Sequence, residues 1–322
     1  MQFKTIPIAM ICDKNFIMQT CVALTSMYLN KDADTIYEIY VILVESEGKE
    51  ADSIKELSSD NFNIHILMMS LEKYRNIKQI AHVPLASLVK FDICDLISEY
   101  SKILYLDGDI IVRQDLWQIY STELEDNYVA GVPHSLGIVT SEHKLNGGVL
   151  LFNAEKIRNE KLRDVFVSTR QSMGDRKSMD QETFHVVFGE KKKYLCPKYN
   201  VMVDKINYEK KYYSLREYNN YFKTDYHTYK EIINSAVIMH FTGAAKPWKY
   251  KFGNGTKEWL RYYRMTFPDN NTLPRRGRAF FIAEQVKQNG IRSLYWMLKD
   301  QILAFIGANL EIYIDKSYGK WN

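Results

Sequence analysis

The chain has 322 residues, of which 46% are hydrophobic and 13% aromatic, and this is enough to bury the core of one large α/β domain with an appendage. Residues 275–322 hold eight Lys or Arg against four Asp or Glu, which accounts for the whole net charge of +4 and leaves the rest of the chain neutral. A neutral body excludes the basic, aromatic-lined face of a nucleic-acid-binding protein, so we expect no nucleic-acid partner.

Neither an export signal nor a membrane-spanning segment is expected. The first apolar stretch, Ile6–Cys12, contains Pro7 and is too short for the core of a signal peptide. No apolar run approaches the ~20 residues that a spanning helix requires. The cysteines are scattered without a CxxC pair, which predicts buried thiols in a reducing compartment and a cytoplasmic protein. The four are Cys12, Cys21, Cys94 and Cys196.

The first 132 residues alternate between short, β-branched apolar runs and longer stretches with helical periodicity. The predicted strands are Ile6–Cys12, Tyr37–Val44, Ile64–Met69, Lys102–Leu106 and Tyr128–Val132. The predicted helices are Phe16–Leu29, Lys49–Ser58 and Leu85–Ile97. Strands this apolar, separated by helices, favour an α/β fold with a mostly parallel central sheet that is covered on both faces. Ligands of such sheets bind at the carboxyl ends of the strands.

The pattern after residue 132 is less regular. A strand is predicted at Gly147–Asn153, a polar helix from Ala154 to about Gln171, and a further apolar run covers Ala236–His240. The Pro- and Asn-rich residues 268–274 predict a linker. We therefore expect a catalytic domain over residues 1–267 and a helical, basic C-terminal extension over residues 268–322.

Two carboxylates interrupt an otherwise buried segment. Asp107, Gly108 and Asp109 directly follow the predicted strand Lys102–Leu106 and precede another apolar run. Carboxylates two positions apart on extended backbone project to the same side, where they can share Mg²⁺ or Mn²⁺, cations that also bind diphosphate oxygens. Gly108 lets a ligand approach the backbone. The alternative is a turn with two solvated acids, but the apolar runs on both sides favour a metal site.

A second polar cluster follows the apolar run that ends at His240. The imidazole of His240 can offer a neutral nitrogen to a metal, and Lys246, six residues on, can reach a phosphate as a point charge. Gly243 leaves room for a diphosphate near the main chain. A histidine alone at such a position is more often structural, but the clustering of His, Gly and Lys on one loop favours a metal and phosphate site.

Four motifs in this order resemble those of the retaining glycosyltransferases of family 8, which include bacterial lipooligosaccharide galactosyl- and glucosyltransferases and glycogenin. The resemblance covers roughly residues 6–248. The motifs are Leu-Tyr-Leu-Asp-x-Asp at 104–109, Asn-x-Gly-Val-Leu-Leu-x-Asn at 146–153, Asp-Gln at 180–181 and His-x-x-Gly-x-x-Lys-Pro-Trp at 240–248. Each alone is weakly specific, whereas the ordered set is specific. The resemblance implies the GT-A fold, which binds nucleotide sugars.

The resemblance also implies roles for single residues. Asp107, Asp109 and His240 match the family's Mn²⁺ ligands, so Mn²⁺ (or Mg²⁺) is the implied cofactor. The other matches concern a UDP-sugar donor: Gly243 and Lys246 near the diphosphate, Asp13 and Asn15 at the uracil and ribose, and Asn146, Asp180 and Gln181 around the sugar. Apart from the resemblance, Asn146 is compatible with a strand-entry turn and Asp180 with the N-cap of the following helix.

Two positions depart from the family's pattern. Many relatives carry an arginine in the helix before the metal strand, where this chain has Lys90, which keeps the charge but loses bidentate hydrogen bonding. The lipooligosaccharide galactosyltransferases have an aspartate after the strand that ends here at Val132, where this chain has Pro133 and His134. That position lies near the donor sugar in the family, so His134 leaves glucose, galactose and an N-acetylated sugar open.

The expected function is transfer of a hexose, glucose or galactose, from a UDP-sugar to a saccharide acceptor such as a lipopolysaccharide, lipooligosaccharide or other surface glycan. The resemblance implies retention at the anomeric carbon. The metal and Lys246 would stabilise charge on the departing UDP, and the acceptor would attack from the face that UDP leaves. Gln181 is the candidate nearest the opposite face, and a covalent intermediate on Asp180 stays open.

Three other functions are compatible with parts of the pattern. A phosphatase of the haloacid dehalogenase type also has Asp-x-Asp after an apolar strand, but that motif normally opens the chain, whereas Asp107 lies a third of the way along. A non-catalytic sugar- or nucleotide-binding module would not need candidates at every metal position. Glycogenin-like self-glycosylation, or glycosylation of another protein, is suggested only by the 23 tyrosines.

The C-terminal segment combines an apolar helical stripe with basic residues. The stripe is Ile291, Leu294, Tyr295, Leu298, Ile302 and Phe305, and the basic residues are Arg275, Arg276, Arg278, Lys287, Arg292 and Lys299. Such a helix packs on the catalytic domain or lies on an anionic membrane surface. Because the family's lipopolysaccharide glucosyltransferases carry a similar extension, we expect peripheral docking at the cytoplasmic membrane face, where a lipid-linked acceptor would be presented.

Overall fold

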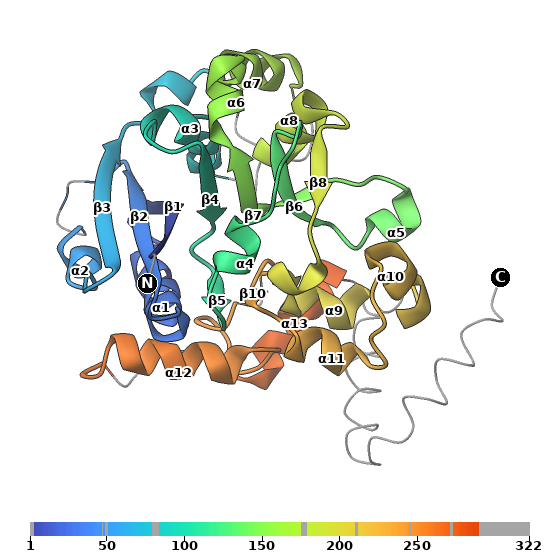
Figure 1. Ribbon diagram of the computed structural model, residues 1–322. Coiled ribbons are helices and arrows are strands. Elements are labelled where there is room, and N and C mark those ends of the chain that lie inside the picture. The colour runs from blue at the N-terminus through green and yellow to red at the C-terminus, as the bar shows by residue number, and fades with distance from the viewer. Residues whose placement is uncertain are drawn as a thin grey trace.

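Seven strands form the main sheet in the order β3-β2-β1-β4-β7-β6-β8 (Figure 1). Every pair of neighbours is parallel except those of β7, which runs antiparallel to β4 and to β6. The predicted mostly parallel sheet is therefore confirmed. The strands are β1 (Lys4–Asp13), β2 (Thr35–Val44), β3 (Phe62–Met69), β4 (Lys102–Leu106), β6 (Val129–Pro133), β7 (Leu145–Asn153) and β8 (Lys192–Tyr194).

The structure is a computed structural model. It describes residues 3–46, 48, 51–78, 84–174, 179–209, 212–244, 246–270 and 273–289.

A smaller sheet of three strands has the order β5-β10-β9. Strand β5 (Ile110–Val112) continues the chain beyond the two aspartates that follow β4, and it pairs antiparallel with β10 (Ile238–His240). Strand β9 (Val201–Met202) lies parallel to β10 on its other side. This sheet therefore brings the segment around residue 110 beside segments more than ninety residues further along the chain.

The helices cover both faces of the main sheet, with 3-10 turns labelled η. In chain order they are α1 (Ile17–Asn30), α2 (Ala51–Lys55), η1 (Glu72–Tyr74), η2 (Leu85–Phe91), α3 (Ile93–Leu96), α4 (Trp117–Tyr120), α5 (Gly137–Thr140), α6 (Ala154–Asn159), α7 (Leu162–Ser172), α8 (Asp180–Phe188), η3 (Pro197–Tyr199), α9 (Val203–Glu209), α10 (Leu215–Phe222), α11 (Tyr229–Asn234), α12 (Thr256–Thr266) and α13 (Arg278–Asn289).

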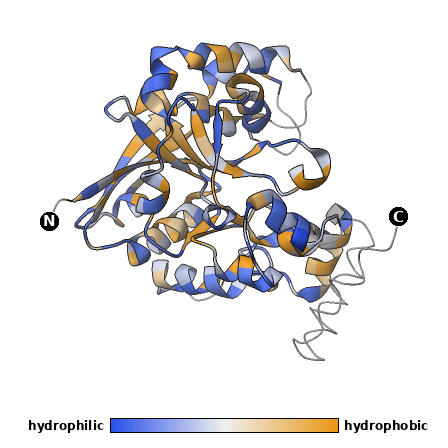
Figure 2. Ribbon diagram, turned by 45° about the vertical axis from the view of Figure 1, so that its right-hand side comes forward, coloured by the Kyte–Doolittle hydropathy of each residue, from blue (hydrophilic) through white to orange (hydrophobic). Residues whose placement is uncertain are grey.

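Alternate residues of the central strands supply two separate cores. On β1, the side chains of Ile6, Ile8 and Met10 pack with α1, α2 and α4, whereas Ala9 faces η2, α3 and α6–α8. The central strands are consequently mostly apolar, and orange stretches run along them in Figure 2, because a parallel sheet buries both faces. Each fully buried aliphatic side chain contributes about 1.5–3 kcal/mol.

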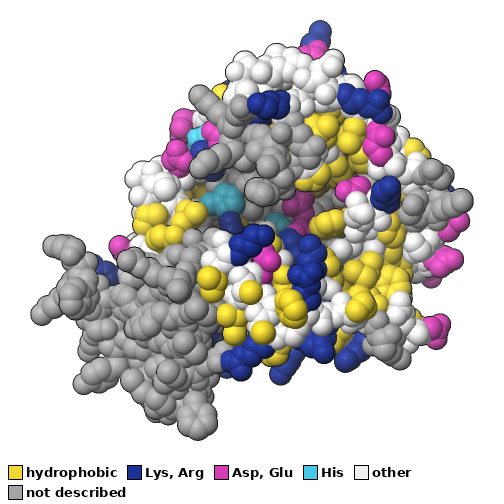
Figure 3. Space-filling view, turned by 180° about the vertical axis from the view of Figure 1, so that it is seen from behind, with side chains coloured by type: hydrophobic (Ala, Val, Ile, Leu, Met, Phe, Trp, Pro, Cys, Tyr) yellow, Lys and Arg dark blue, Asp and Glu magenta, His cyan; other side chains and the backbone are white. Residues whose placement is uncertain are grey.

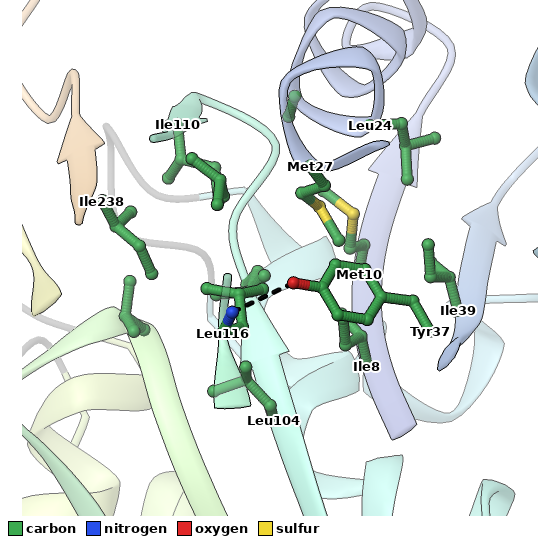
Figure 4. Packing of buried hydrophobic residues seen from close by; sticks show 14 of the residues in the cluster. Ile8, Met10, Leu24, Met27, Tyr37, Ile39, Leu104, Ile110, Leu116 and Ile238 are labelled. Atoms are coloured by element: carbon green, nitrogen blue, oxygen red, sulfur yellow. Dashed lines mark hydrogen bonds between the residues drawn. The ribbon is translucent and has the colours of Figure 1, made fainter. Parts of the chain in front are cut away.

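The first core also holds a polar contact that fixes β2 to the segment after β5. The hydroxyl of the fully buried Tyr37 accepts a hydrogen bond from the backbone N–H of Leu116 at 3.0 Å (Figure 4) and donates one to Asp115 Oδ2 at 3.1 Å. A buried phenol needs such partners because an unpaired hydroxyl inside an apolar core is costly. A third core, around Trp259 and Tyr263, packs α12 against α1 and the smaller sheet.

Most predicted elements are present, and three helix predictions require correction. The helix expected at Leu85–Ile97 is two pieces, η2 and α3, separated at Asp92, whose buried carboxylate binds Lys73, Arg163 and the Tyr74 hydroxyl. The polar helix expected from Ala154 divides into α6 and α7 at Lys161, which adopts a left-handed conformation with φ of 52°. Helix α2 is shorter than predicted, and residues 49 and 50 lie outside the described residues.

Two further expectations are corrected. Asp180 is the first residue of α8 and not its N-cap, which is Met179. Three of the cysteines are buried as expected, but Cys196 is exposed because it lies in the turn before η3. In the part of the chain that the structure describes, no helix is both long and apolar enough to cross a membrane. The predicted stripe from Ile291 to Phe305 lies outside the described residues.

Candidate metal centre and its surroundings

The predicted site residues gather where several strands begin or end. Asp107 follows β4 and His240 ends β10, while Asn146 and Gly148 lie at the start of β7. Because β7 is antiparallel to β4, its first residues reach the same edge as the last residues of β4. Figure 3 shows a hollow in the described surface with acidic and histidine side chains at its floor and Lys or Arg side chains below it.

Asp107, Asp109 and His240 form a cluster that could hold a metal ion, with one ligand atom of each within 4.8 Å of the others. The Nε2 atom of His240 lies 3.1 Å from Asp109 Oδ1 and 3.7 Å from Asp107 Oδ2. The turn between β4 and β5 orients both carboxylates, and the antiparallel pairing of Ile110 with His240 brings the imidazole beside them. The structure thus brings the three predicted ligands together.

Asp109 is the more enclosed of the two carboxylates, with 8% of the residue exposed. Its Oδ2 atom accepts a hydrogen bond from Lys246 Nζ at 2.6 Å. Burial by itself would raise the pKa of Asp109, but the ammonium of Lys246, followed by the neighbouring His240, holds that pKa well below its ordinary value. Asp109 is therefore a carboxylate, the form that binds a cation.

Asp107 is positioned by a backbone and a side-chain contact. Its N–H donates to the carbonyl of Gly148 at 2.8 Å, and its Oδ1 accepts from the hydroxyl of Tyr105 at 2.5 Å. Burial, followed by the neighbouring charge of Asp107, raises the pKa of Tyr105, so the phenol stays the donor. These contacts leave Oδ2, the atom nearer His240, as the oxygen available to an ion.

The backbone of Gly148 lies against two of the three candidate ligands. A Cβ at this position would lie 2.3 Å from His240 Cε1 and 2.5 Å from Asp107 Oδ2. No side chain fits there without displacing one of them. The Asn-x-Gly motif therefore needs a glycine at position 148 because His240 and Asp107 lie close to its backbone, and not because of an unusual backbone angle.

Lys90 is a buried cation beside the metal cluster. Its Nζ atom lies 2.7 Å from Asp180 Oδ2, 2.9 Å from the Gly147 carbonyl and 3.5 Å from Asp107 Oδ1. Burial lowers the pKa of Lys90, but Asp107 and Asp180 outweigh that effect and raise the pKa above its ordinary value. Lys90 therefore links the predicted sugar residue Asp180 to the predicted ligand Asp107.

His134 and Gln181, both predicted near the donor sugar, are hydrogen-bonded to each other at 2.7 Å. Burial, with a contribution from the charge of Lys205, lowers the pKa of His134 to about 4. The imidazole is then neutral near pH 7, and its Nε2–H donates to Gln181 Oε1. The backbone of Gly147 lies against Gln181 and Asp180, because a Cβ at Gly147 would be 2.7 Å from Gln181 Cγ and 2.9 Å from Asp180 Oδ2.

The segment after β1 lies beside the loop that follows β10. Asp13 Oδ1 accepts from the N–H of Asn15 at 2.7 Å, so the predicted uracil and ribose residues form one turn. With its amide oriented to suit its neighbours, Gln19 donates to the Asn15 carbonyl at 3.2 Å and accepts from Trp248 Nε1 at 3.1 Å. Gly108 also contacts this region, since its Cβ would lie 2.8 Å from Thr20 Oγ1.

Two predicted phosphate contacts are engaged within the protein. Lys246 binds Asp109 and the carbonyl of Phe241. The face of Gly243 that was expected to be open lies against Asp204, whose Oδ1 accepts from the Thr242 N–H at 3.1 Å. In this structure, therefore, a carboxylate lies against the glycine where a phosphate was expected.

Asn200 is a residue of this cluster that the sequence did not indicate. Its Oδ1 lies 2.9 Å from His240 Nδ1, and its Nδ2 donates to Asn146 Oδ1 at 2.8 Å. Tyr105 and Asp204 were missed in the same way. The weak signal for Asn200 is its place directly before the short apolar run Val201–Val203, whose first two residues form β9, parallel to β10.

The donor set fits a divalent cation. Carboxylate oxygens suit Mg²⁺ and Mn²⁺, and an imidazole nitrogen beside them favours a transition metal over Mg²⁺. The backbone of Gly148 leaves the space between Asp107 and His240 free of any Cβ. The residues present therefore agree with the Mn²⁺ site that the family resemblance implies.

Comparison with known proteins identifies relatives. The pattern of "Glycosyl transferase family 8" matches residues 7–251. Glycosyltransferase GlyD of Streptococcus pneumoniae serotype 4 is 26% identical over 272 residues, which are 81% of this chain and 30% of GlyD. GlyB of the same organism is 27% identical over 222 residues, 66% of this chain and 50% of GlyB. The chain thus spans half or less of these relatives' length.

A relative of more similar length is the lipopolysaccharide 1,3-galactosyltransferase of Salmonella typhimurium, which is 22% identical over 265 residues, 73% of this chain and 71% of that enzyme. Among solved structures, the galactosyltransferase LgtC in complex with donor and acceptor sugar analogues matches with a TM-score of 0.67 and 21% identity, over 84% of this chain and 98% of LgtC. That likeness shows the GT-A fold. With a family pattern that matches most of its length, this chain belongs to glycosyltransferase family 8.

Proposed function

We propose that the protein is a retaining hexosyltransferase that moves glucose or galactose from a UDP-sugar to a saccharide acceptor. The observation that carries the proposal is the cluster of Asp107, Asp109 and His240 beside the buried pair of Lys90 and Asp180, in a chain of family 8. The first group could hold a divalent cation, which would bind the donor's diphosphate, and the second group would lie beside the sugar.

Mn²⁺, or Mg²⁺, would be held by Asp107, Asp109 and His240 and would supply positive charge to the diphosphate. Lys246 is the second source of positive charge, because its flexible side chain already reaches the same cluster through Asp109. A cation near the departing UDP stabilises the charge that develops there, and such stabilisation is usually the largest contribution to catalysis of this kind. Asp13 and Asn15 would contact the uracil and ribose.

The sugar would be oriented by Asn146, Asp180 and Gln181. Lys90 holds the Asp180 carboxylate in one orientation, and His134 does the same for the Gln181 amide. A carboxylate engaged by an ammonium at 2.7 Å is a poorer nucleophile than a free one, which supports attack by the acceptor from the face that UDP leaves over a covalent intermediate on Asp180. Gln181 is then the residue nearest the opposite face of the sugar.

A direct assay tests the proposal. The purified protein is incubated with UDP-glucose or UDP-galactose, with Mn²⁺ or with EDTA, and release of UDP and of free sugar is measured together with the mass of the protein. We expect Mn²⁺-dependent release of UDP, which Asp109→Asn abolishes and Asp52→Asn, a change at an exposed acid, leaves intact. Equal activity in EDTA would contradict the metal mechanism. A mass increase of the protein would favour the glycogenin-like alternative.

The acceptor is proposed to be a surface glycan such as a lipopolysaccharide, since two relatives are named lipopolysaccharide galactosyl- and glucosyltransferases. We also propose peripheral binding to the anionic cytoplasmic face of the membrane through residues 268–322. The described part of this extension packs on residues 249–252, where Arg276 exchanges backbone hydrogen bonds with Lys249 and Lys251. Within the described part, Phe252 and Phe280 are 41% and 62% exposed, and Lys249, Lys251 and Arg276 are exposed around them. Exposed aromatic and basic side chains together suit an anionic lipid surface.

Vesicle sedimentation tests the membrane proposal with the full chain. Binding to vesicles that contain phosphatidylglycerol should fall as salt rises and should weaken in Lys251→Glu with Arg276→Glu, while release of UDP from a soluble donor stays unchanged. The pair Lys55→Glu and Lys191→Glu, on other faces of the fold, is the matched control. Full-length protein that ignores such vesicles at low salt would exclude membrane docking.

A further inference from the structure

We infer that Asn200 is a positioning residue that fixes His240 in the tautomer able to bind the metal, an inference that rests on the proposed function of the Asp107, Asp109 and His240 cluster. The imidazole of His240 is 2% exposed and has a different partner on each nitrogen. Its Nε2 faces Asp109 Oδ1 at 3.1 Å, and its Nδ1 lies 2.9 Å from Asn200 Oδ1. Which nitrogen carries the hydrogen decides whether the ring can act as a ligand.

A backbone amide determines which groups donate and which accept in these hydrogen bonds. The N–H of Gly148 lies 3.0 Å from Asn146 Oδ1, and a backbone N–H can only donate, so Asn146 must present its oxygen there. That same oxygen lies 2.8 Å from the Asn200 amide, so Asn200 must present its NH₂ group to Asn146. Asn200 Oδ1 therefore points at His240, and His240 Nδ1 must be the donor.

A hydrogen on Nδ1 leaves the lone pair of a neutral imidazole on Nε2, the nitrogen that faces the two carboxylates. In the opposite tautomer, an N–H bond would point into the cation position, and Nδ1 and Asn200 Oδ1 would be two acceptors facing each other. Asn200 and Asn146 are 1% and 4% exposed, so solvent offers neither amide an easy replacement partner. The chain of contacts from Gly148 through both asparagines therefore selects the metal-binding tautomer.

The same glycine also orients the other candidate ligand. The carbonyl of Gly148 accepts from the Asp107 N–H at 2.8 Å, while its N–H begins the contacts that end on His240. A structural asparagine with no such role would show bonds to backbone groups or to polar side chains remote from the ligands. Asn219 in α10 is of that kind, because it binds the Tyr226 carbonyl and the Thr224 hydroxyl.

Titration with Mn²⁺, followed by the electron paramagnetic resonance signal of the free ion, measures the effect directly. We expect Asn200→Ala to weaken Mn²⁺ binding by about 10–100-fold, the usual loss when the hydrogen-bond partner of a ligating histidine is removed. Asn219→Ala, the matched control, should bind Mn²⁺ like the wild type. Circular dichroism and urea unfolding show whether each variant is folded.

A second measurement needs no variant at Asn200. In protein labelled with ¹⁵N-histidine, without metal and in alkaline buffer, long-range ¹H–¹⁵N correlations distinguish the two tautomers, and the signal missing from His240→Gln assigns His240. A hydrogen on Nδ1 supports the inference, and a hydrogen on Nε2 overturns it. If the wild type binds Mn²⁺ and Asn200→Ala binds it equally well, the inference fails while the proposed function stands. If the wild type binds no Mn²⁺, the proposed metal site itself is wrong.

Discussion

Lys90 shows how much one buried charge determines at this site. Its ammonium contacts the carboxylate of Asp180 and the carbonyl of Gly147, and it lies within 3.5 Å of Asp107. Desolvation of an ammonium is costly, and the nearby carboxylates offset that cost only as long as both partners are present. The lysine that departs from the family's arginine is therefore a fully engaged structural cation and not a weakened substitute.

Replacement of Lys90 by methionine should lower the free energy of unfolding by about 3–5 kcal/mol, because Asp180 would stay buried without its partner. Urea unfolding of the two proteins at neutral pH measures the difference. Lys4→Met removes the surface pair of Lys4 with Asp34 at 2.8 Å and should change stability little. Equal decreases in the free energy of unfolding in Lys90→Met and Lys4→Met would show that the buried pair stabilises the fold no more than the surface pair does.

His134 gives the stability of the protein a dependence on pH. Its pKa is lowered by burial from 6.5 to about 4 in the folded state, so between these values the unfolded chain binds more protons than the folded one. The contribution of His134 to the free energy of unfolding is therefore complete above pH 6.5 and is lost as the pH falls toward 4. Urea midpoints measured across this range should fall less steeply in His134→Gln than in the wild type. Parallel curves would contradict the assignment.

Among the elements, the start of β7 connects the separate parts of the site. The antiparallel pairing of Leu106 with Val149 brings Gly147 and Gly148 opposite the aspartates that follow β4. The carbonyl of Gly147 accepts a hydrogen bond from Lys90, and the absence of a side chain at Gly147 leaves room for Asp180 and Gln181. The carbonyl of Gly148 accepts a hydrogen bond from the Asp107 N–H, and the absence of a side chain at Gly148 leaves room for Asp107 and His240. Two adjacent glycines thus separate the predicted sugar side of the site from the predicted metal side.

Substitution of Gly148 by alanine should abolish most Mn²⁺ binding and transfer, because the added Cβ would lie 2.3 Å from His240 Cε1 and displace the imidazole. Titration with Mn²⁺ and the UDP-release assay measure both effects. Gly277→Ala, where nothing lies within 4 Å of the added atom, is the matched control and should behave like the wild type. Wild-type metal affinity in Gly148→Ala would show that the ligands tolerate a shift of this size.

The sequence predicted the elements whose hydrophobic pattern is strong and missed those held by contacts from elsewhere. The apolar strands are found within two residues of their predicted ends, for example β4 at Lys102–Leu106. Between residues 172 and 236 the sequence indicated only a helix after Asp180, yet β8, β9 and α9 to α11 also lie there. Strand β9 has only two residues, so its pairing with β10 leaves no periodicity to detect.

The candidate site divides in the same way. Asp107, Asp109 and His240 were predicted together because each follows an apolar run and because the ordered motifs resemble a family. Asn200 was missed because its importance comes from one contact with His240 across 40 positions of sequence. The engagement of Lys246 by Asp109 was missed for the same reason, since nothing in either motif shows that the two side chains meet.

At the scale of the whole molecule, the two sheets and α12 form one body around the site. Arg113, just after β5, makes a bidentate pair with Glu258 of α12 at 2.7 and 2.8 Å and also donates to the carbonyl of Ile233. Asn30 at the end of α1 contacts Val112 and Tyr262. The segments that carry the candidate ligands are therefore fixed to the same frame, and a ligand that binds between them stabilises the entire fold.

UDP and Mn²⁺ together should raise the thermal unfolding temperature more than the sum of their separate effects, because the ion would bind the protein and the diphosphate at once. Free ligand at a hundredfold excess over its Kd stabilises the folded state by about 2.7 kcal/mol. Differential scanning fluorimetry with UDP, Mn²⁺ and both measures this. In Asp109→Asn the combined rise in unfolding temperature should equal the sum of the two separate rises. A combined rise as large as in the wild type would mean that the ion binds elsewhere.

The pairing of β10 between β5 and β9 also sets the order in which the site comes into existence. Chains emerge from the ribosome with the N-terminus first, and contacts between distant segments form late. Strands β1 to β4 can pair while synthesis continues, which places Asp107 and Asp109 early, but the imidazole that completes the cluster belongs to residue 240. A nascent chain that stops before His240 carries two acidic ligands without the third, so complete ion capture is confined to finished molecules.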